Sequence, residues 1–175
     1  ILFWVCAAGK NGKTSARCLD RLLTTWKSGS PFETVRRIPN LASELKAHGI
    51  GCYNHKTRTF LTLATSNLNL RTCSVEDLEG IPGIGPKTAR CFLIHSRKDQ
   101  PYAGLDTHVL KFLRDTGHAV PKSTPTGKRY KKLEQIFLSL CRKIGMTVSE
   151  FDLLIWNAYS GNSGNPNHVL SLVNK

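Results

Sequence analysis

The stretch that decides the fold is Leu78-Glu-Gly-Ile-Pro-Gly-Ile-Gly-Pro-Lys-Thr-Ala-Arg90. Two of its glycines, Gly83 and Gly85, flank an isoleucine, and a proline precedes the first of them. Pro86 suits the first position of a helix, where its missing N–H costs nothing. The two glycine N–H groups are then expected to face outward beside the start of that helix, an arrangement that binds a phosphate oxygen without reading base sequence.

The surroundings of this stretch predict a hairpin between two helices. Ile81 and Ile84 are expected to anchor the helices against each other. Upstream, Ser74 and Asp77 form a capping box, a serine followed by an acid three residues later, which predicts a short helix before the hairpin. The alternative is an ordinary corner between two helices that binds nothing.

Apolar residues at helical spacing predict further helices along most of the chain. These predicted helices cover residues 14–26, 31–37, 41–48, 54–64, 86–96, 106–116, 130–144 and 149–159, with a last turn at 167–173. Asn40 is a plausible N-cap for the third of them. Because alternating strand-like patterns are scarce, the sequence predicts an all-α fold.

The stretch Ala7-Ala-Gly-Lys-Asn-Gly-Lys-Thr-Ser15 looks at first like a nucleotide-binding loop. The loop pattern G-x-x-x-x-G-K-[ST] requires a glycine at the first position, where a Cβ would obstruct the turn. That position is Ala7 here. No hydrophobic strand ending in an aspartate follows, so the sequence argues against a nucleotide hydrolase.

The charge of the chain favours a polyanionic partner. Its 175 residues hold 25 Lys and Arg against 12 Asp and Glu, a net charge of +13, with a pI of about 9.8. Such an excess, spread along the whole chain, is typical of a folded basic surface that binds nucleic acid or an acidic membrane surface. A merely soluble basic protein is the alternative.

The cysteines and apolar runs suggest where the protein works. None of the six cysteines forms a C-x-x-C pair, so a zinc site is not expected. Cys18 and Cys91 lie in helix-like patterns, where a thiol behaves as a small buried hydrophobe. We expect a reducing, intracellular compartment. No run approaches the length of a membrane span and no signal peptide is visible, so no membrane partner is expected.

Two further motifs accompany the hairpin, and the three together resemble one family. The hairpin itself is similar to the helix-hairpin-helix motif at every position. Downstream, Leu105-Asp-Thr-His-Val109 is similar to the V-D-T-H-V element of the helix-hairpin-helix DNA glycosylases, the superfamily of endonuclease III. Upstream, Gly49-Ile-Gly-Cys-Tyr-Asn-His-Lys56 resembles the I-G-x-Y-N-x-K turn of that superfamily.

The resemblance implies an all-α protein of two lobes with a DNA cleft between them. One lobe is expected to cover residues 14–119, with the helix-hairpin-helix at about 78–96, and the other residues 1–13 and 120–175. The expected activity is a DNA N-glycosylase with apurinic/apyrimidinic (AP) lyase activity, acting as a monomer on a base flipped out of duplex DNA. Two alternatives stay open: a phage-type enzyme that modifies a thymine-derived base, and a non-catalytic DNA-binding module.

The resemblance also assigns two catalytic residues. Asp106 matches the family's aspartate, which stabilises the positive charge that builds on the sugar as the glycosidic bond breaks. An N-cap of the following helix is its alternative role. Lys87 stands where the lyase-competent branch carries its nucleophile, an amine that attacks C1′ once it is neutral. Its alternative role is one more phosphate contact.

Other site residues follow from the same resemblance. The apolar N-terminal run is expected to form a helix that ends in a DNA-facing loop, in which Lys10 and Lys13 reach phosphates and Asn11 enters the gap left by the extruded base. Tyr53 and Asn54 are expected to line the base pocket, although Tyr53 could equally be a packed core residue. The hairpin residues expected to bind DNA are Gly83, Ile84, Gly85 and Thr88.

The sequence departs from the family in its cysteines and in its first loop. Many relatives bind an iron–sulfur cluster through four cysteines near the C-terminus, but no cysteine follows Cys141 here, so we expect no cluster. A monovalent cation at the hairpin is the one ion that the resemblance allows. The first loop lacks the usual glutamine-like wedge. The base that is recognised cannot be read from the sequence.

Overall fold

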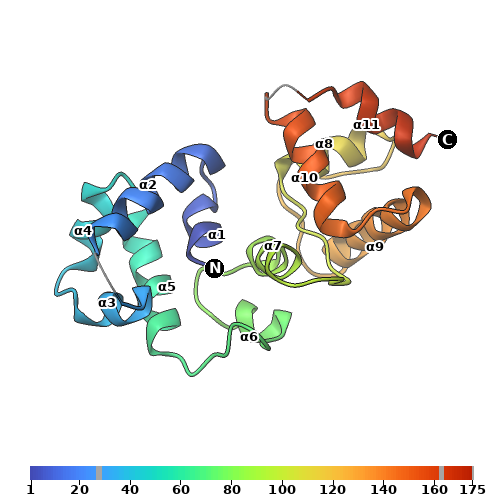
Figure 1. Ribbon diagram of the computed structural model, residues 1–175. Coiled ribbons are helices and arrows are strands. Elements are labelled where there is room, and N and C mark those ends of the chain that lie inside the picture. Colours follow the sequence, from blue (N-terminus) through green and yellow to red (C-terminus); the bar gives the residue numbers. More distant parts are fainter. Residues whose placement is uncertain (27–28, 162–163, 175) are drawn as a thin grey trace. The chain divides into compact units, whose positions relative to one another are not determined.

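The computed structural model describes residues 1–26, 29–161 and 164–174, and every regular element within them is an α-helix (Figure 1). The all-α fold predicted from the sequence is confirmed. The helices are α1 Leu2–Ala7, α2 Gly12–Thr25, α3 Pro31–Arg37, α4 Leu41–Ala47, α5 Tyr53–Thr65, α6 Val75–Glu79, α7 Pro86–Ser96, α8 Thr107–Asp115, α9 Gly127–Ile144, α10 Val148–Tyr159 and α11 Pro166–Val173.

Local sequence signals explain where several helices begin. The capping box of α6 is present: Ser74 Oγ accepts from the N–H of Asp77 at 3.0 Å, and Asp77 Oδ2 accepts from the N–H of Ser74 at 2.8 Å. Asn40 Oδ1 accepts from the N–H of Ser43 at 3.1 Å at the start of α4. Both predicted caps are confirmed, because each side chain satisfies an N–H that the first helical turn leaves unpaired.

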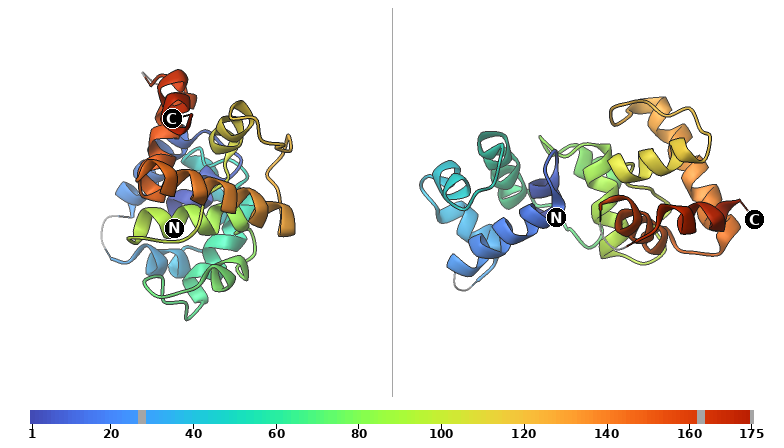
Figure 2. Two further views of the ribbon diagram at one scale, coloured as in Figure 1. Left: turned by 90° about the vertical axis from the view of Figure 1, so that its right-hand side faces the viewer. Right: turned by 90° about the horizontal axis from the view of Figure 1, so that it is seen from above.

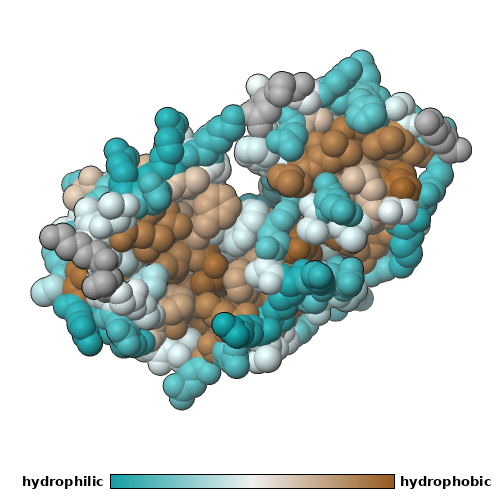
Figure 3. All heavy atoms as spheres, viewed as in Figure 1, coloured by the Kyte–Doolittle hydropathy of each residue, from teal (hydrophilic) through white to brown (hydrophobic). Residues whose placement is uncertain are grey.

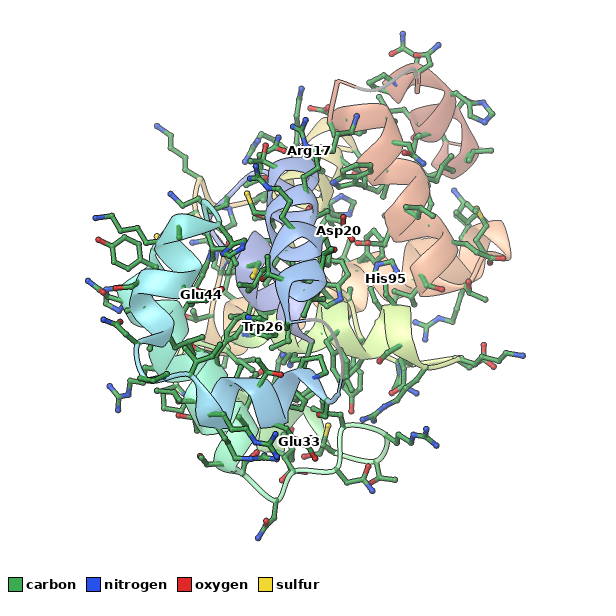
Figure 4. All side chains as sticks on the ribbon, turned by 60° about the vertical axis from the view of Figure 1, so that its left-hand side comes forward. Arg17, Asp20, Trp26, Glu33, Glu44 and His95 are labelled. Atoms are coloured by element: carbon green, nitrogen blue, oxygen red, sulfur yellow. The ribbon has the colours of Figure 1, made fainter. Side chains whose placement is uncertain are left out.

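The chain divides into two compact units, Ile1–Thr88 and Ala89–Lys175, with the boundary inside α7. In the first unit α5 is central, because α1, α3 and α4 all pack on it, and α1 also packs on α2. Arg17 and Asp20 lie on the exposed side of α2 (Figure 4). The opposite side of α2 is buried in the core of this unit.

The second unit has its own aromatic core. Helix α10 packs on α8, α9 and α11 (Figure 2). Phe151 of α10 lies edge-to-face with Phe112 of α8 at 5.3 Å between ring centroids, and it stacks on Phe137 of α9 at 5.4 Å. Such aromatic pairs add stability beyond the area that they bury. The three rings fix α8 and α9 around α10.

The bounds of these units differ from those of the lobes expected at 14–119 and at 1–13 with 120–175. Residues 1–13 contribute α1, whose Leu2, Val5 and Cys6 are buried, and α1 packs on α2 and α5 of the first unit. A short apolar helix buries its apolar side on its neighbours. The predicted cleft between lobes stays a prediction.

The surface mixes hydrophilic and apolar residues. Figure 3 shows patches of apolar residues on the visible face, with hydrophilic residues around and between them. In the part of the chain that the structure describes, no helix has both the length and the apolar character needed to cross a membrane.

Candidate nucleic-acid interface

The predicted hairpin lies between α6 and α7, in the first unit. Ile81 and Ile84 are both buried, as expected for the anchors of the two helices. The N–H of Ile84 donates to the carbonyl of Ile81 at 3.0 Å, which closes the turn. With its side chain and N–H both used, Ile84 keeps only its carbonyl for an outside contact. The predicted role of Ile84 in DNA binding, and a monovalent cation at the hairpin, stay predictions.

Gly83 must be glycine for two reasons. Its φ of +90° lies in the left-handed region, and a Cβ built on it would lie 2.2 Å from Thr59 Oγ1. Thr59, on α5, donates from that hydroxyl to the carbonyl of Pro82 at 2.7 Å. The close approach of Thr59 therefore ties the tip of the hairpin to α5 and leaves no room for a side chain at Gly83.

Gly85 differs from Gly83 because no residue that the structure describes requires a glycine at this position. A Cβ at Gly85 would meet no atom within 4 Å, and its φ is not left-handed. Among the described residues, the N–H groups of Gly83 and Gly85 have no hydrogen-bond acceptor. Both residues are exposed. The hairpin thus presents two unpaired backbone donors beside the N-terminus of α7, which suits an anion.

Lys87 is the second residue of α7 and is half-buried. Its Nζ lies 5.8 Å from the centroid of the Trp4 ring of α1, within the range of a cation–π interaction. Trp4 thereby restricts where the amine can lie. Thr88 is buried, so a contact of its side chain with DNA stays a prediction.

Asp106, in the second unit, is the N-cap of α8. Its Oδ1 accepts from the N–H of His108 at 2.8 Å and from that of Val109 at 2.9 Å. The capping role considered from the sequence is therefore present. Among the described residues Oδ2 has no hydrogen bond, so one carboxylate oxygen stays available for chemistry. Lys87 belongs to the first unit and Asp106 to the second.

Lys10 and Asn11 lie in the loop after α1, and Lys13 is the second residue of α2; all three are exposed. Asn11 is the N-cap of α2, where its Oδ1 accepts from the N–H of Thr14 at 3.0 Å. Entry of Asn11 into DNA stays a prediction, and it would require this cap bond to open. Lys10 lies over Gly51, since a Cβ on that glycine would be 2.6 Å from Lys10 Cε. The loop and the turn before α5 are therefore packed together.

Residues of these two segments, with others from α1 and α2, line a cavity of about 310 Å³. It is lined by Cys6, Lys10, Asn11, Thr14, Ser15, Cys18, Gly49, Ile50 and Gly51. Tyr53 and Asn54 do not line it, although both begin α5 directly after the turn. Tyr53 has Lys46 Nζ at 5.6 Å from its ring centroid. The expected contact of Tyr53 and Asn54 with a flipped base stays a prediction.

Lys56 ends the turn motif at Gly49–Lys56, and the sequence predicted no role for it. It is only 5% exposed, and its Nζ donates to the carbonyl of Cys6 at 2.6 Å. Ser15 Oγ donates to the same carbonyl at 3.1 Å. Burial lowers the pKa of Lys56, and it raises the pKa of the Cys6 thiol to about 11. Lys56 holds the last turn of α1, where helix carbonyls lack partners, and so fixes the start of the loop.

Across residues 1–26, 29–161 and 164–174, no group of three or more His, Cys, Asp or Glu side chains could hold a metal ion. The second unit also contains a pair of titratable side chains that joins α7 to α10. His95 of α7 (Figure 4) lies 2.8 Å from Asp152 Oδ2 of α10.

Both the hairpin and the fold have counterparts in known proteins. The family model for the helix-hairpin-helix motif matches residues 68–95, which contain α6, the hairpin and most of α7. Two solved structures share the fold, and both are DNA glycosylases. The chain therefore contains the predicted helix-hairpin-helix motif and shares the fold of these two proteins.

The first of these structures is the 8-oxoguanine DNA glycosylase of Thermotoga maritima. It has a TM-score of 0.71 and 24% identity, over 94% of this chain and 79% of that one. The second is the Methanocaldococcus jannaschii 8-oxoguanine glycosylase/lyase in complex with a 15-mer DNA containing 8-oxoguanine. Its TM-score is 0.72 and its identity 22%, over 92% of this chain and 79% of that one. At such identities the structures establish the fold.

A curated relative is similar in sequence over a shorter range. The 8-oxoguanine DNA glycosylase/AP lyase of Picrophilus torridus is 32% identical over 84 residues, which make up 48% of this chain. The match covers 40% of the length of that relative, so the chain spans about two fifths of it.

Proposed function

We propose that the protein is a DNA N-glycosylase with AP lyase activity that excises 8-oxoguanine from duplex DNA. The observation that carries the proposal is the hairpin, which places a lysine in the first turn of α7 directly after two unpaired glycine N–H groups. Further support comes from the activity named for the relatives in Thermotoga, Methanocaldococcus and Picrophilus.

In the proposed reaction, the neutral amine of Lys87 attacks C1′ of the flipped nucleotide, and the bond from C1′ to the base breaks. The base leaves with the electron pair and takes up a proton. The carboxylate of Asp106 stabilises the positive charge that develops on the sugar. Loss of a proton from nitrogen and ring opening give a Schiff base between Lys87 and C1′. Removal of a proton from C2′ then expels the 3′-phosphate and nicks the strand.

The hairpin and the basic loop would hold the DNA during this reaction. The N–H groups of Gly83 and Gly85 would bind a phosphate oxygen, and Lys10 and Lys13 would neutralise further phosphates. Such contacts fix the register of the protein on the duplex and carry no base information. The choice of base would then depend on the pocket that receives the flipped nucleotide.

Borohydride trapping tests the proposed function. Duplexes that carry a single 8-oxoguanine, a single uracil, an oxidised pyrimidine or a preformed abasic site are each incubated with wild-type protein and borohydride. We expect a covalent protein–DNA adduct on the 8-oxoguanine and abasic duplexes. If the adduct forms on the abasic duplex alone, the result would support the AP lyase activity and reject 8-oxoguanine as the substrate. Binding without any adduct would reject the proposed glycosylase and lyase activity. If the bound DNA then contained altered bases, the protein would be a base-modifying enzyme.

Gly85→Ala and Gly83→Ala form a matched pair of variants. Gly85→Ala is expected to leave the free energy of unfolding within about 0.5 kcal/mol of wild type, because its Cβ meets open space. It should weaken duplex binding about tenfold, since the Cβ obstructs the approach of a phosphate. Gly83→Ala should lower the free energy of unfolding by about 1–3 kcal/mol from its backbone conformation alone.

Thermal unfolding and fluorescence anisotropy with a labelled duplex measure the two effects of this pair. Unchanged DNA affinity in Gly85→Ala would mean that the hairpin does not bind the backbone. Normal stability in Gly83→Ala would contradict both the left-handed conformation of Gly83 and the close approach of Thr59.

The affinity for duplex DNA should fall steeply as salt rises, because each neutralised phosphate releases counterions. We expect Lys10→Ala and Lys13→Ala each to reduce the slope of log K against log salt by about 0.9. Lys143→Ala is the control, since Lys143 Nζ donates to the carbonyl of Val173 at 2.7 Å. Anisotropy titrations at several salt concentrations give the slopes. A flat wild-type response would count against DNA as the partner.

A further inference from the structure

The segment that leads into Asp106 is held by side chains of α9. The hydroxyl of Tyr130 donates to the carbonyl of Ala103 at 2.7 Å and accepts from the N–H of Leu105 at 3.1 Å. Ala103 and Leu105 are fully buried, so their backbone groups need partners inside the protein. One hydroxyl thus bonds the backbone on both sides of Gly104.

Glu134 holds the same segment from one helical turn further along α9. Its Oε1 accepts from the N–H of Ala103 at 3.0 Å and from Arg90 Nε at 2.8 Å. Because Tyr130 and Glu134 are four residues apart, they lie on one face of α9. Ala103 therefore has both its N–H and its carbonyl bound by this face.

Arg90, on α7, completes the group. Its guanidinium carbon lies 4.6 Å from the centroid of the Tyr130 ring, in addition to the bond to Glu134. Tyr130, Glu134 and Arg90 are only 1%, 5% and 7% exposed. Burial in the core raises the pKa of Tyr130, so its hydroxyl stays protonated and able to donate. We call these three residues the α9 clamp. With every charge paired, such a buried network is rigid.

Because Gly104 has no side chain, the segment lies directly against α7 and cannot move closer to it. A Cβ on Gly104 would lie 2.3 Å from Cys91 Sγ and 3.5 Å from Cys91 Cα, so the two backbones are in close contact. The N–H of Asp106 then donates to the carbonyl of Gly104 at 2.7 Å. The backbone is thus held by the α9 clamp and by α7 up to the residue that carries the carboxylate.

We propose that Tyr130 and Glu134 are positioning residues that set the orientation of the Asp106 carboxylate, an inference that rests on the proposed function. Asp106 uses Oδ1 to cap α8, and this fixes its side chain relative to its own backbone. The direction of Oδ2 is then decided by the backbone at residues 103–106, which the α9 clamp holds. A carboxylate that stabilises a transition state must be held closely, because a displacement of about 1 Å can cost about 100-fold in rate.

Tyr130→Phe is the test variant, because it removes the hydroxyl and keeps the ring. We expect its single-turnover rate of base excision from the 8-oxoguanine duplex to fall about 10- to 100-fold. Its affinity for an uncleaved duplex should stay within about twofold, since the change does not touch a DNA contact. Phe137→Leu is the control: it perturbs the core from the same helix without a hydrogen bond to the segment. Its excision rate should stay close to wild type at temperatures where it is folded.

A double-mutant cycle separates positioning from a general structural effect. If Tyr130 acts through Asp106, Tyr130→Phe should have little further effect in an Asp106→Asn background. The proposal would be overturned if the two substitutions reduced the excision rate independently, so that their effects multiplied in the double variant. An unchanged rate in Tyr130→Phe, or an equal loss of rate in Phe137→Leu, would also overturn it. Should Tyr130→Phe fail to fold, Glu134→Gln takes its place in the same cycle, since the neutral amide weakens the bonds to Arg90 and to the N–H of Ala103 without opening a cavity.

Amide hydrogen exchange tests the positioning without any activity. In wild type the N–H groups of Leu105, His108 and Val109 are expected to be protected. Tyr130→Phe should lose that protection at all three, whereas Phe137→Leu should lose it only as its global stability falls. If wild type excises no base but these amides respond as expected, the proposed function fails and the positioning of Asp106 stands. Protection that survives in Tyr130→Phe overturns the positioning itself.

Discussion

Lys87→Ala is expected to bind duplex DNA and to form no covalent adduct with it. The amine is the atom that would bond to C1′, so its removal leaves no Schiff base for borohydride to reduce. We expect strand nicking at a preformed abasic site to fall by about 10³-fold or more, since removing the nucleophile from other covalent enzymes costs even more. Affinity for an uncleaved duplex should drop only modestly, by the loss of one positive charge. Gel analysis of trapped adducts and anisotropy titrations measure the two effects.

Two other lysines serve as controls for Lys87→Ala. Lys10→Ala removes an exposed charge from the loop after α1 and should weaken binding while keeping the adduct. Lys56→Met tests the buried amine, whose pKa is lowered by burial but whose Nζ is used by the carbonyl of Cys6. An adduct that persists in Lys87→Ala and disappears only when Lys56 is also replaced would assign the nucleophile to Lys56. Thermal unfolding of each variant ensures that only folded protein is compared.

The all-α fold and the helix-hairpin-helix motif could be predicted from the sequence because their signals are local. The capping box at Ser74 and the glycines of the hairpin depend on neighbours within a few residues, and such patterns are legible along the chain. The lysine and aspartate positions followed from motifs of the same kind, although their chemical roles stay predictions. Helix starts were less accurate: α9 begins at Gly127 and not at Tyr130, because no side-chain cap marks its N-terminus.

The hydrogen bonds that hold the site residues in place could not be predicted, because they join residues far apart in the sequence. Glu134 bonds to Arg90, which is 44 residues away, and Lys56 bonds to Cys6, which is 50 residues away. In the sequence Glu134 is one acid in a basic helix, which most simply indicates an exposed residue. Glu134 becomes a buried hydrogen-bond acceptor only because α9 packs on the segment before Asp106. Burial also decides which lysine has a lowered pKa, and burial is a property of the fold.

Asp106→Asn is expected to fold like wild type and to excise bases much more slowly. Asparagine caps helices as well as aspartate does, and its side-chain oxygen can accept from the N–H groups of His108 and Val109 as Oδ1 does now. The free energy of unfolding should therefore change by less than about 0.5 kcal/mol. The neutral amide cannot stabilise positive charge on the sugar, so we expect excision to slow by about 10²- to 10³-fold.

Asp106→Ala is the matched control, since it removes both the cap and the charge. It should lose about 1 kcal/mol of stability as well as the activity. Single-turnover excision on the 8-oxoguanine duplex, with alkaline cleavage of the product, measures the first step apart from the lyase step. If Asp106→Asn excises at the wild-type rate and Asp106→Ala is only less stable, the carboxylate is an N-cap and nothing more. If both are slow and only Asp106→Ala is destabilised, the two oxygens have separate roles, one in the helix and one in the reaction.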